Sequence, residues 1–200
     1  MIISFRFQDI HGRIIMKTLI AYGTRYGATA TTSEEIGKIL REEGFDVDIY
    51  DLKKEKVKNI SQYELVIVAS GLRMFRWTKE PENFLKKFRK ELAMKRLAIF
   101  VSSGAQAMFK HEGKKQEMDD AWQKYLVKKT EKYELAPVLM GIQGGVWDFN
   151  KMGFFAKTMS EFKQELMAAG IPETAPGVFD TRDWDEIRSW AKELALIAHG

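Results

Sequence analysis

Short, nearly continuous apolar runs are the feature of this 200-residue chain that most constrains its fold. Four of them occupy residues 18–22 (TLIAY), 64–69 (ELVIVA), 97–102 (LAIFVS) and 136–142 (APVLMGI). Such runs are typical of parallel strands, because a parallel sheet is covered on both faces. A fifth run, 46–50 (DVDIY), alternates and predicts a less buried strand. The chain is therefore expected to form a five-stranded parallel sheet.

Helical periodicity fills the stretches between these runs. Apolar residues recur at three- and four-residue spacing, which predicts helices over 28–43, 79–92, 114–131 and 183–198, with 52–62 as the weakest. Gly44 lies where a C-terminal cap belongs, and Asp183 and Glu186 have the spacing of a capping pair. Strands that alternate with helices predict an α/β three-layer sandwich, with helices on both faces of the sheet.

The stretch 143–182 is too long for a simple connection, which indicates extra structure or function. Its middle, 152–168, predicts a further helix that closes one side of the sheet, through Phe155, Met159, Phe162 and Leu166. An alternative is peripheral contact of 143–168 with an anionic bilayer, through Phe154, Phe155 and Phe162 and the lysines between them.

Composition excludes several classes of protein. The chain has no cysteine, which rules out disulfides, thiolate catalysis and thiolate-bound metal clusters and fits a cytoplasmic location. Its three histidines lie far apart in the sequence, so we expect no metal site. The net charge of +4 is spread along the chain, and no nucleic-acid signature accompanies it. Residues 1–15 are expected to be an N-terminal extension, and residues 16–200 a single domain.

The loop after the first strand, residues 23–29 (GTRYGAT), indicates an anion site. It leads into a helix, where unpaired backbone N–H groups and the positive end of the helix dipole attract an anion. The hydroxyls of Thr24 and Thr29 add donors, but no lysine follows Gly27, as a triphosphate loop would require. A single phosphate monoester fits this loop. A threonine-rich helix cap without a ligand remains the alternative.

Two further loops leave neighbouring strands at the same sheet edge, where open parallel sheets bind ligands. Residues 70–78 (SGLRMFRWT) contain Phe75 and Trp77, on which a planar ring can stack. Residues 102–106 (SSGAQ) are small and polar. A phosphate site, an aromatic surface and a hydrogen-bonding loop together predict a mononucleotide with a large ring, flavin mononucleotide (FMN).

From about Met16 onward, the chain resembles the flavodoxin family, and within it the branch that includes the menaquinone-dependent protoporphyrinogen dehydrogenases. Three stretches carry the resemblance: LIAYGTRYGAT, VIVASGLRMFRW and DTRDWDEIRSWAKELA. It implies the flavodoxin-like strand order 2-1-3-4-5. It also implies an FMN-binding domain over 16–200, with 143–182 as a long insertion before the last helix.

The resemblance also implies the residues that bind the cofactor. For the phosphate these are Thr24, Arg25, Tyr26, Gly27, Ala28 and Thr29. For the flavin ring they are Ser70, Gly71, Leu72, Arg73 and Trp77 on one side and Ser103, Gly104 and Ala105 on the other. The segment 141–147 stands where the branch has a stretch that can approach the flavin. No catalytic acid or base is identifiable, although Glu80 and Asp148 are available.

Three functions remain open. The first is an FMN-dependent oxidoreductase that passes electrons to a quinone-like or protein acceptor, with protoporphyrinogen oxidation as one option and quinone reduction as another. The second is an electron carrier without a substrate of its own. The basic composition speaks against it, because flavodoxin carriers are typically acidic. The third is a flavin-free scaffold. The donor, the acceptor and the oligomeric state do not follow from the sequence.

Overall fold

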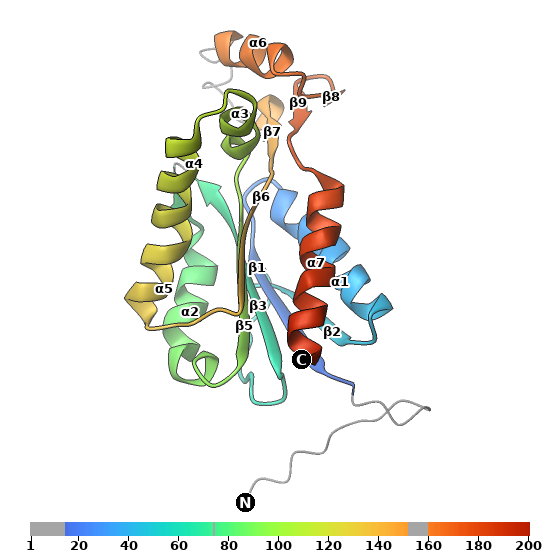
Figure 1. Ribbon diagram of the computed structural model, residues 1–200, viewed down its shortest axis with the longest axis vertical. Helices are drawn as coiled ribbons and strands as arrows, with labels where there is room; N and C mark the ends of the chain where they lie inside the picture. The colour runs from blue at the N-terminus through green and yellow to red at the C-terminus, as the bar shows by residue number, and fades with distance from the viewer. Residues whose placement is uncertain (1–14, 74, 152–159) are drawn as a thin grey trace, which may run out of the picture.

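The computed structural model describes residues 15–73, 75–151 and 160–200 (Figure 1). Its centre is a parallel sheet in the order β2-β1-β3-β5-β6. The strands are β1 (Lys17–Gly23), β2 (Asp46–Asp51), β3 (Leu65–Arg73), β5 (Arg96–Ser102) and β6 (Leu139–Gln143). A short sixth strand, β4 (Arg76–Trp77), pairs antiparallel with β3. The five parallel strands follow the predicted order 2-1-3-4-5, so the predicted fold is confirmed.

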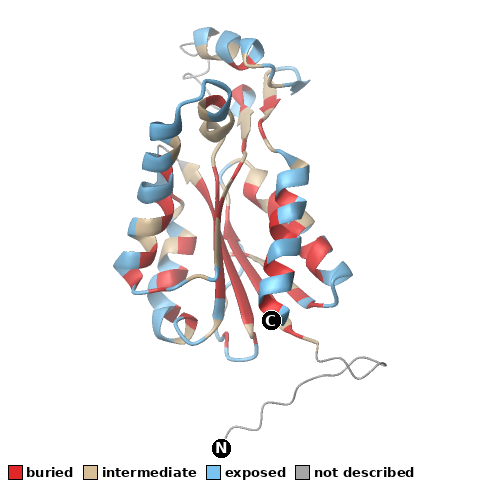
Figure 2. Cartoon of the chain, in the orientation of Figure 1, coloured by how far each residue is buried: buried red, intermediate tan, exposed pale blue. Residues whose placement is uncertain are grey.

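Two helical layers cover the sheet (Figure 1). Helices α1 (Ala28–Glu42) and α7 (Trp184–His199) lie on one face, and α2 (Lys79–Leu92), α4 (Lys115–Trp122) and α5 (Lys128–Tyr133) lie on the other. Ile20 of β1 packs in the first layer, and its neighbour Leu19 packs in the second. Both side chains are fully buried, as the red strands of Figure 2 illustrate. Burial on both faces explains why the strands are continuous apolar runs.

Most of the predicted helices form within a residue or two of their expected ends. The Asp183 carboxylate caps α7, because it accepts the backbone N–H groups of Asp185 and Glu186, each at 3.0 Å. The Glu186 side chain does not complete the predicted capping pair, since it forms an ion pair with Lys110 of α3 (Ala105–His111). The predicted helix 114–131 is divided into α4, a π-helical turn (Gln123–Val127) and α5.

The predicted helix over 52–62 is wrong. The chain instead leaves β2 in a turn, in which the Asp51 carboxylate accepts the Lys53 N–H at 3.0 Å. Four lysines in this short segment disfavour a helix, and two of them, Lys54 and Lys58, would stand one turn apart and repel each other. Packing favours the extended path, because it buries Ile60 beneath the sheet.

Residues 146–151 and 160–180 form a small lobe over the C-terminal ends of the strands, at the top of Figure 1. Its described part contains an antiparallel sheet in the order β7-β9-β8 and the helix α6 (Ser160–Ala168). The strands are β7 (Val146–Asp148), β8 (Glu173–Ala175) and β9 (Val178–Asp180). A short 3₁₀ turn (Phe149–Lys151) follows β7.

The expectation that a helix in 152–168 closes one side of the main sheet is wrong. Leu166 of α6 packs with Phe149 and Phe179 of the lobe and with Met108 of α3. The lobe has a sheet of its own, so α6 buries its apolar side there. The predicted contacts of Phe154, Phe155 and Met159 lie outside the described residues.

Residues 1–14, most of the predicted N-terminal extension, also lie outside the described part of the chain. In the part that the structure describes, no helix is both long enough and apolar enough to cross a bilayer.

Candidate functional site

The strand-exit loops converge on one cavity of about 90 Å³ at the C-terminal edge of the sheet. The first loop and the start of α1 contribute Thr24, Arg25, Tyr26, Ala28 and Thr29. Gly71 and Leu72 line it from the end of β3, and Ser102 and Gly104 from the end of β5 and the loop after it. Gly145, Val146 and Trp147 line it from the junction with the lobe. The three loops predicted to share a site therefore do meet.

The N-terminus of α1 is open toward an anion. Its cap residue, Gly27, has a left-handed φ of 100°, which favours glycine, and no side chain caps the helix. No acidic residue occupies the first turn of α1. The Thr24 hydroxyl accepts the Gly27 N–H at 3.0 Å, and its own O–H remains available to a ligand. Free amides, a helix dipole and a hydroxyl here favour a negatively charged group.

Two buried hydroxyls of the cavity lack partners. The side-chain oxygens of Thr29 and Ser102 form no hydrogen bond with any described residue. Buried polar atoms nearly always form hydrogen bonds in native proteins. Two hydroxyls without a partner in one cavity therefore indicate a polar ligand. Gly71 makes room beside Thr29, because a Cβ at this position would come within 2.9 Å of the Thr29 hydroxyl.

Several residues predicted to contact the cofactor support the loops instead of lining the cavity. The fully buried Ser70 hydroxyl accepts the Thr78 N–H at 3.0 Å and so fixes the turn after β3. Ser103 donates its N–H to the Gln143 carbonyl at 2.9 Å. Gly27 precedes α1, and Ala105 begins α3. The Arg73 side chain lies outside the described part of the chain.

Trp77 is placed in the core, away from the cavity. Pairing of Leu72 with Trp77 in the β3–β4 hairpin turns its indole toward the α2 and α5 layer. The indole N–H donates to the Tyr125 carbonyl in the π-helical turn at 2.9 Å. The Lys129 ammonium lies 5.4 Å from the ring centre. Phe75, the other aromatic residue of this loop, is 68% exposed and has a positive φ of 59°.

Neither residue noted as an available acid or base is placed as one. Asp148 is buried and bound by Lys151, whose ammonium lies 2.7 Å from its carboxylate. That hydrogen bond outweighs burial and lowers the pKa of Asp148, so the group is ionised at neutral pH. Glu80 lies in the first turn of α2 and is not among the residues that line the cavity. The described residues contain no cluster of three metal-ligating side chains.

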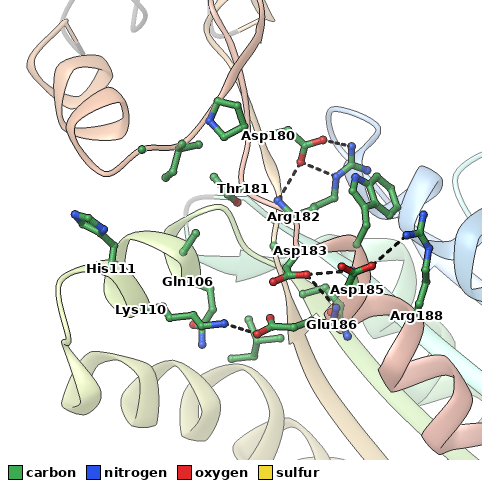
Figure 3. Close-up of a pocket in the computed structure, with 18 residues that line it drawn as sticks. Gln106, Lys110, His111, Asp180, Thr181, Arg182, Asp183, Asp185, Glu186 and Arg188 are labelled. Carbon is green, nitrogen blue, oxygen red and sulfur yellow. Dashed lines mark hydrogen bonds and ion pairs between the residues drawn. The ribbon is translucent and has the colours of Figure 1, made fainter.

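A larger hollow of about 680 Å³ lies on the other side of the β6–β7 link, between α3, the lobe and the start of α7 (Figure 3). Its charges are largely paired among themselves. Arg182 binds Asp180 through two nitrogens, at 2.8 and 2.6 Å, and lies over the Trp184 ring at 4.4 Å. Arg188 pairs with Asp185 at 3.3 Å. The hollow therefore presents no concentrated charge, unlike the open end of α1.

A family model described as a flavodoxin domain matches residues 19–169. The match covers more than half of the chain, so this chain belongs to the flavodoxin-domain family.

One curated relative is protoporphyrinogen IX dehydrogenase (quinone) of Escherichia coli K12. It is 23% identical over 182 residues, which cover 91% of this chain and 96% of the relative.

Two solved structures share the fold. One is a flavodoxin from the domain Archaea, with 15% identity, a TM-score of 0.54 and coverage of 92% of this chain and 100% of that one. The other is the rubredoxin–oxygen oxidoreductase of Desulfovibrio gigas, with 15% identity and a TM-score of 0.53. It is matched over 92% of this chain and 36% of its own length.

Proposed function

We propose that this chain binds FMN in the cavity at the strand ends and works as an FMN-dependent oxidoreductase. The observation that carries the proposal is the open N-terminus of α1, together with the unpaired hydroxyl of Thr29. Membership of the flavodoxin-domain family supports the same conclusion. A cytoplasmic location is part of this proposal and is supported by the absence of cysteine.

The phosphate of FMN would bind the first loop and the start of α1. The backbone amides of Ala28 and Thr29 and the hydroxyls of Thr24 and Thr29 would donate hydrogen bonds to it. Arg25 is exposed at the rim and would add positive charge. Amides, hydroxyls and one arginine match a dianionic monoester without magnesium.

The flavin ring would lie toward Gly71 and Leu72 on one side and Gly104 on the other, with the Ser102 hydroxyl available to a polar atom of the ring. Ser70, Ser103 and Ala105 would act through the backbone of these loops. Trp77 is left out of this proposed set, because it is buried in the core. When bound, FMN supplies reversible hydride or electron transfer, and the chain fixes its orientation and surroundings.

For the substrates, we propose a quinone as electron acceptor and a porphyrinogen as donor. The support is the name of the E. coli relative, which matches nearly the whole chain. The alternative, a carrier that exchanges electrons only with a protein, predicts no turnover with small molecules. The described part of 143–168 does not support a bilayer contact. Phe162 packs against Trp147, and Lys163 pairs with Glu173 at 2.9 Å.

Titration of the flavin-free protein with FMN tests the cofactor. The double variant Thr24→Ala/Thr29→Ala is expected to bind FMN at least about 30-fold more weakly, since each hydroxyl contributes about 1–2 kcal/mol toward a charged acceptor. Thr174→Ala, an exposed site on the lobe, is the matched control and is expected to bind as the wild type does. Equal affinity of the double variant would contradict the phosphate site.

Anaerobic reduction of the FMN-loaded protein, followed by mixing with an acceptor, tests the substrates. Rapid reoxidation by menadione and reduction by protoporphyrinogen are the expected results. Reoxidation by a redox protein alone would favour the carrier. No binding of FMN would contradict the proposal as a whole.

A further inference from the structure

The lobe contributes a tryptophan to the lining of the proposed cofactor cavity. The proposed flavin chemistry otherwise gives the lobe no role. Trp147 lies on β7, the first strand of the lobe, and lines the cavity together with Thr24, Thr29 and Ser102. Two features of this indole point to a ligand: its fixed position and its unpaired N–H.

Packing fixes the Trp147 indole on two sides. Phe162 of α6 meets it edge-to-face, with ring centres 4.8 Å apart and planes inclined at 72°. Gly104 lies against the edge of the indole that carries the nitrogen. A Cβ on Gly104 would stand 2.3 Å from the indole nitrogen, so only glycine permits this approach. The indole therefore joins the lobe to the loop after β5.

Hydrogen bonds also fix the junction between the lobe and the main domain, close to Trp147. The buried Thr181 hydroxyl accepts the Gly145 N–H and donates to the Gly145 carbonyl, each at 2.9 Å. The Thr181 N–H donates to the same carbonyl at 2.9 Å. The lobe thus leaves and rejoins the main domain at one point, two residues before Trp147.

The Trp147 indole N–H is buried and has no hydrogen-bond partner among the described residues. Indole has one donor and no acceptor, and a buried tryptophan normally pairs it. The unpaired hydroxyls of Thr29 and Ser102 line the same cavity. An unpaired donor held in place by packing at the wall of a polar cavity is accounted for if it donates to the molecule bound there.

We propose that the Trp147 N–H donates a hydrogen bond to an acceptor atom on the edge of the flavin ring, so that the lobe forms one wall of the cofactor site. Trp147 is then a positioning residue for the cofactor, supplied by the 143–182 insertion. The inference rests on the proposed FMN site and gives an acceptor to the Trp147 N–H, which has no partner among the described residues.

The test follows the indole N–H signals of the ¹⁵N-labelled full-length protein as FMN is added. The chain has five tryptophans, and Trp147→Phe identifies the Trp147 signal by its loss. We expect FMN to shift this signal and to slow its exchange with deuterium at least about tenfold. The signal of Trp122, at the end of α4, is expected to stay unchanged.

Affinity provides the second readout. Trp147→Phe keeps an aromatic ring but loses the donor, so we expect FMN to bind about threefold to tenfold more weakly. Trp147→His retains a ring N–H and is expected to recover part of the loss, while Trp122→Phe, the matched control, is expected to bind as the wild type does. Recovery by histidine would not follow from a purely structural role.

The outcomes separate this inference from the proposed function. If FMN binds while the Trp147 signal stays unchanged, the hydrogen bond is refuted and the cofactor assignment stands. If FMN does not bind the wild-type protein, both fail. The measurement on wild-type protein decides the question even if Trp147→Phe does not fold, because Trp147→His also identifies the signal.

Discussion

The main sheet and the lobe differ in the size of their buried cores. Each central strand of the sheet is buried between two helical layers, with fully buried side chains on both faces. Among the described residues, the buried core of the lobe is formed by Met108, Phe149, Leu166 and Phe179, and Met108 comes from α3 of the main domain. The lobe therefore depends on the main domain for its own packing. The comparison teaches that stability resides mainly in the sheet, while the proposed site lies on the border between the two.

Phe100→Ala is expected to have the largest effect on stability. Phe100 of β5 is fully buried and meets Trp190 of α7 edge-to-face at 5.8 Å. Its truncation leaves a cavity between the sheet and a helical layer and is expected to lower the free energy of unfolding by about 3–5 kcal/mol. Urea unfolding measures this. A loss below about 1 kcal/mol would contradict the assignment of stability to the sheet.

Phe179→Ala is the same substitution in the lobe. Phe179 is also fully buried, edge-to-face with Phe149 at 5.9 Å. We expect the amides of β7 and β9 to lose their protection from hydrogen exchange, while those of β1 and β3 keep theirs, because the lobe can open locally. If both sets lost protection equally, the two regions would be one cooperative unit and the comparison would fail.

Thr181→Val tests the junction between the two regions. Valine preserves the shape but removes the hydroxyl that accepts the buried Gly145 N–H, at a cost of about 1–3 kcal/mol. Faster hydrogen exchange in the lobe and weaker FMN binding are expected, both measured against Thr174→Val, an exposed site in the lobe. Unchanged exchange in the lobe would show that Thr181 does not hold it.

The smallest expected effect on the free energy of unfolding is that of Glu82, and it is confined to the main domain. Burial alone would raise its pKa, but hydrogen bonds from Lys132 at 2.8 Å, from Tyr133 at 2.9 Å and from Lys129 at 3.0 Å outweigh burial and lower the pKa to about 2 from an ordinary 4.5. Because the pKa is lower in the folded protein, the stabilisation is present above pH 4.5 and is lost as the pH falls toward 2.

Glu82→Gln is therefore expected to cost about 1 kcal/mol at pH 7 and almost nothing near pH 2. Unfolding curves across this pH range measure the difference, and Glu42→Gln, an exposed pair with Lys38, is the control. Hydrogen exchange in the lobe is expected to stay unchanged. A cost independent of pH would contradict the ionic origin of the effect.

The main domain could be predicted from the sequence because its patterns are long and physically redundant. The run 64–69 is apolar on both faces of a strand, and the helix over 79–92 carries a full apolar stripe. The lobe could not be predicted in this way. Its three strands have three residues each, which is too short for a periodic pattern.

The residues of the candidate site also differ in how well the sequence predicts their positions. Glycines and threonines at the start of α1 predicted an anion loop, because only a few residue types suit an open helix N-terminus, and that loop lines the cavity. Trp77 illustrates the limit: an aromatic residue in a loop suits either a ligand or the core, and the short β4 pairing decides for the core. Ser102 lies in the loop 102–106 that the sequence placed at this edge, and Trp147 ends the segment 141–147 that the resemblance placed near the flavin. What the sequence could not predict is the indole's position, which depends on tertiary packing against Phe162 and Gly104.

The central claim is that the open end of α1 binds the phosphate of FMN, and a comparison of FMN with riboflavin tests it most directly. The two ligands share the flavin ring and the ribityl chain and differ only in the phosphate. Titration of the wild-type protein is expected to show FMN binding at least about 100-fold more tightly than riboflavin, because the phosphate receives several charge-assisted hydrogen bonds. Equal affinities would contradict the account.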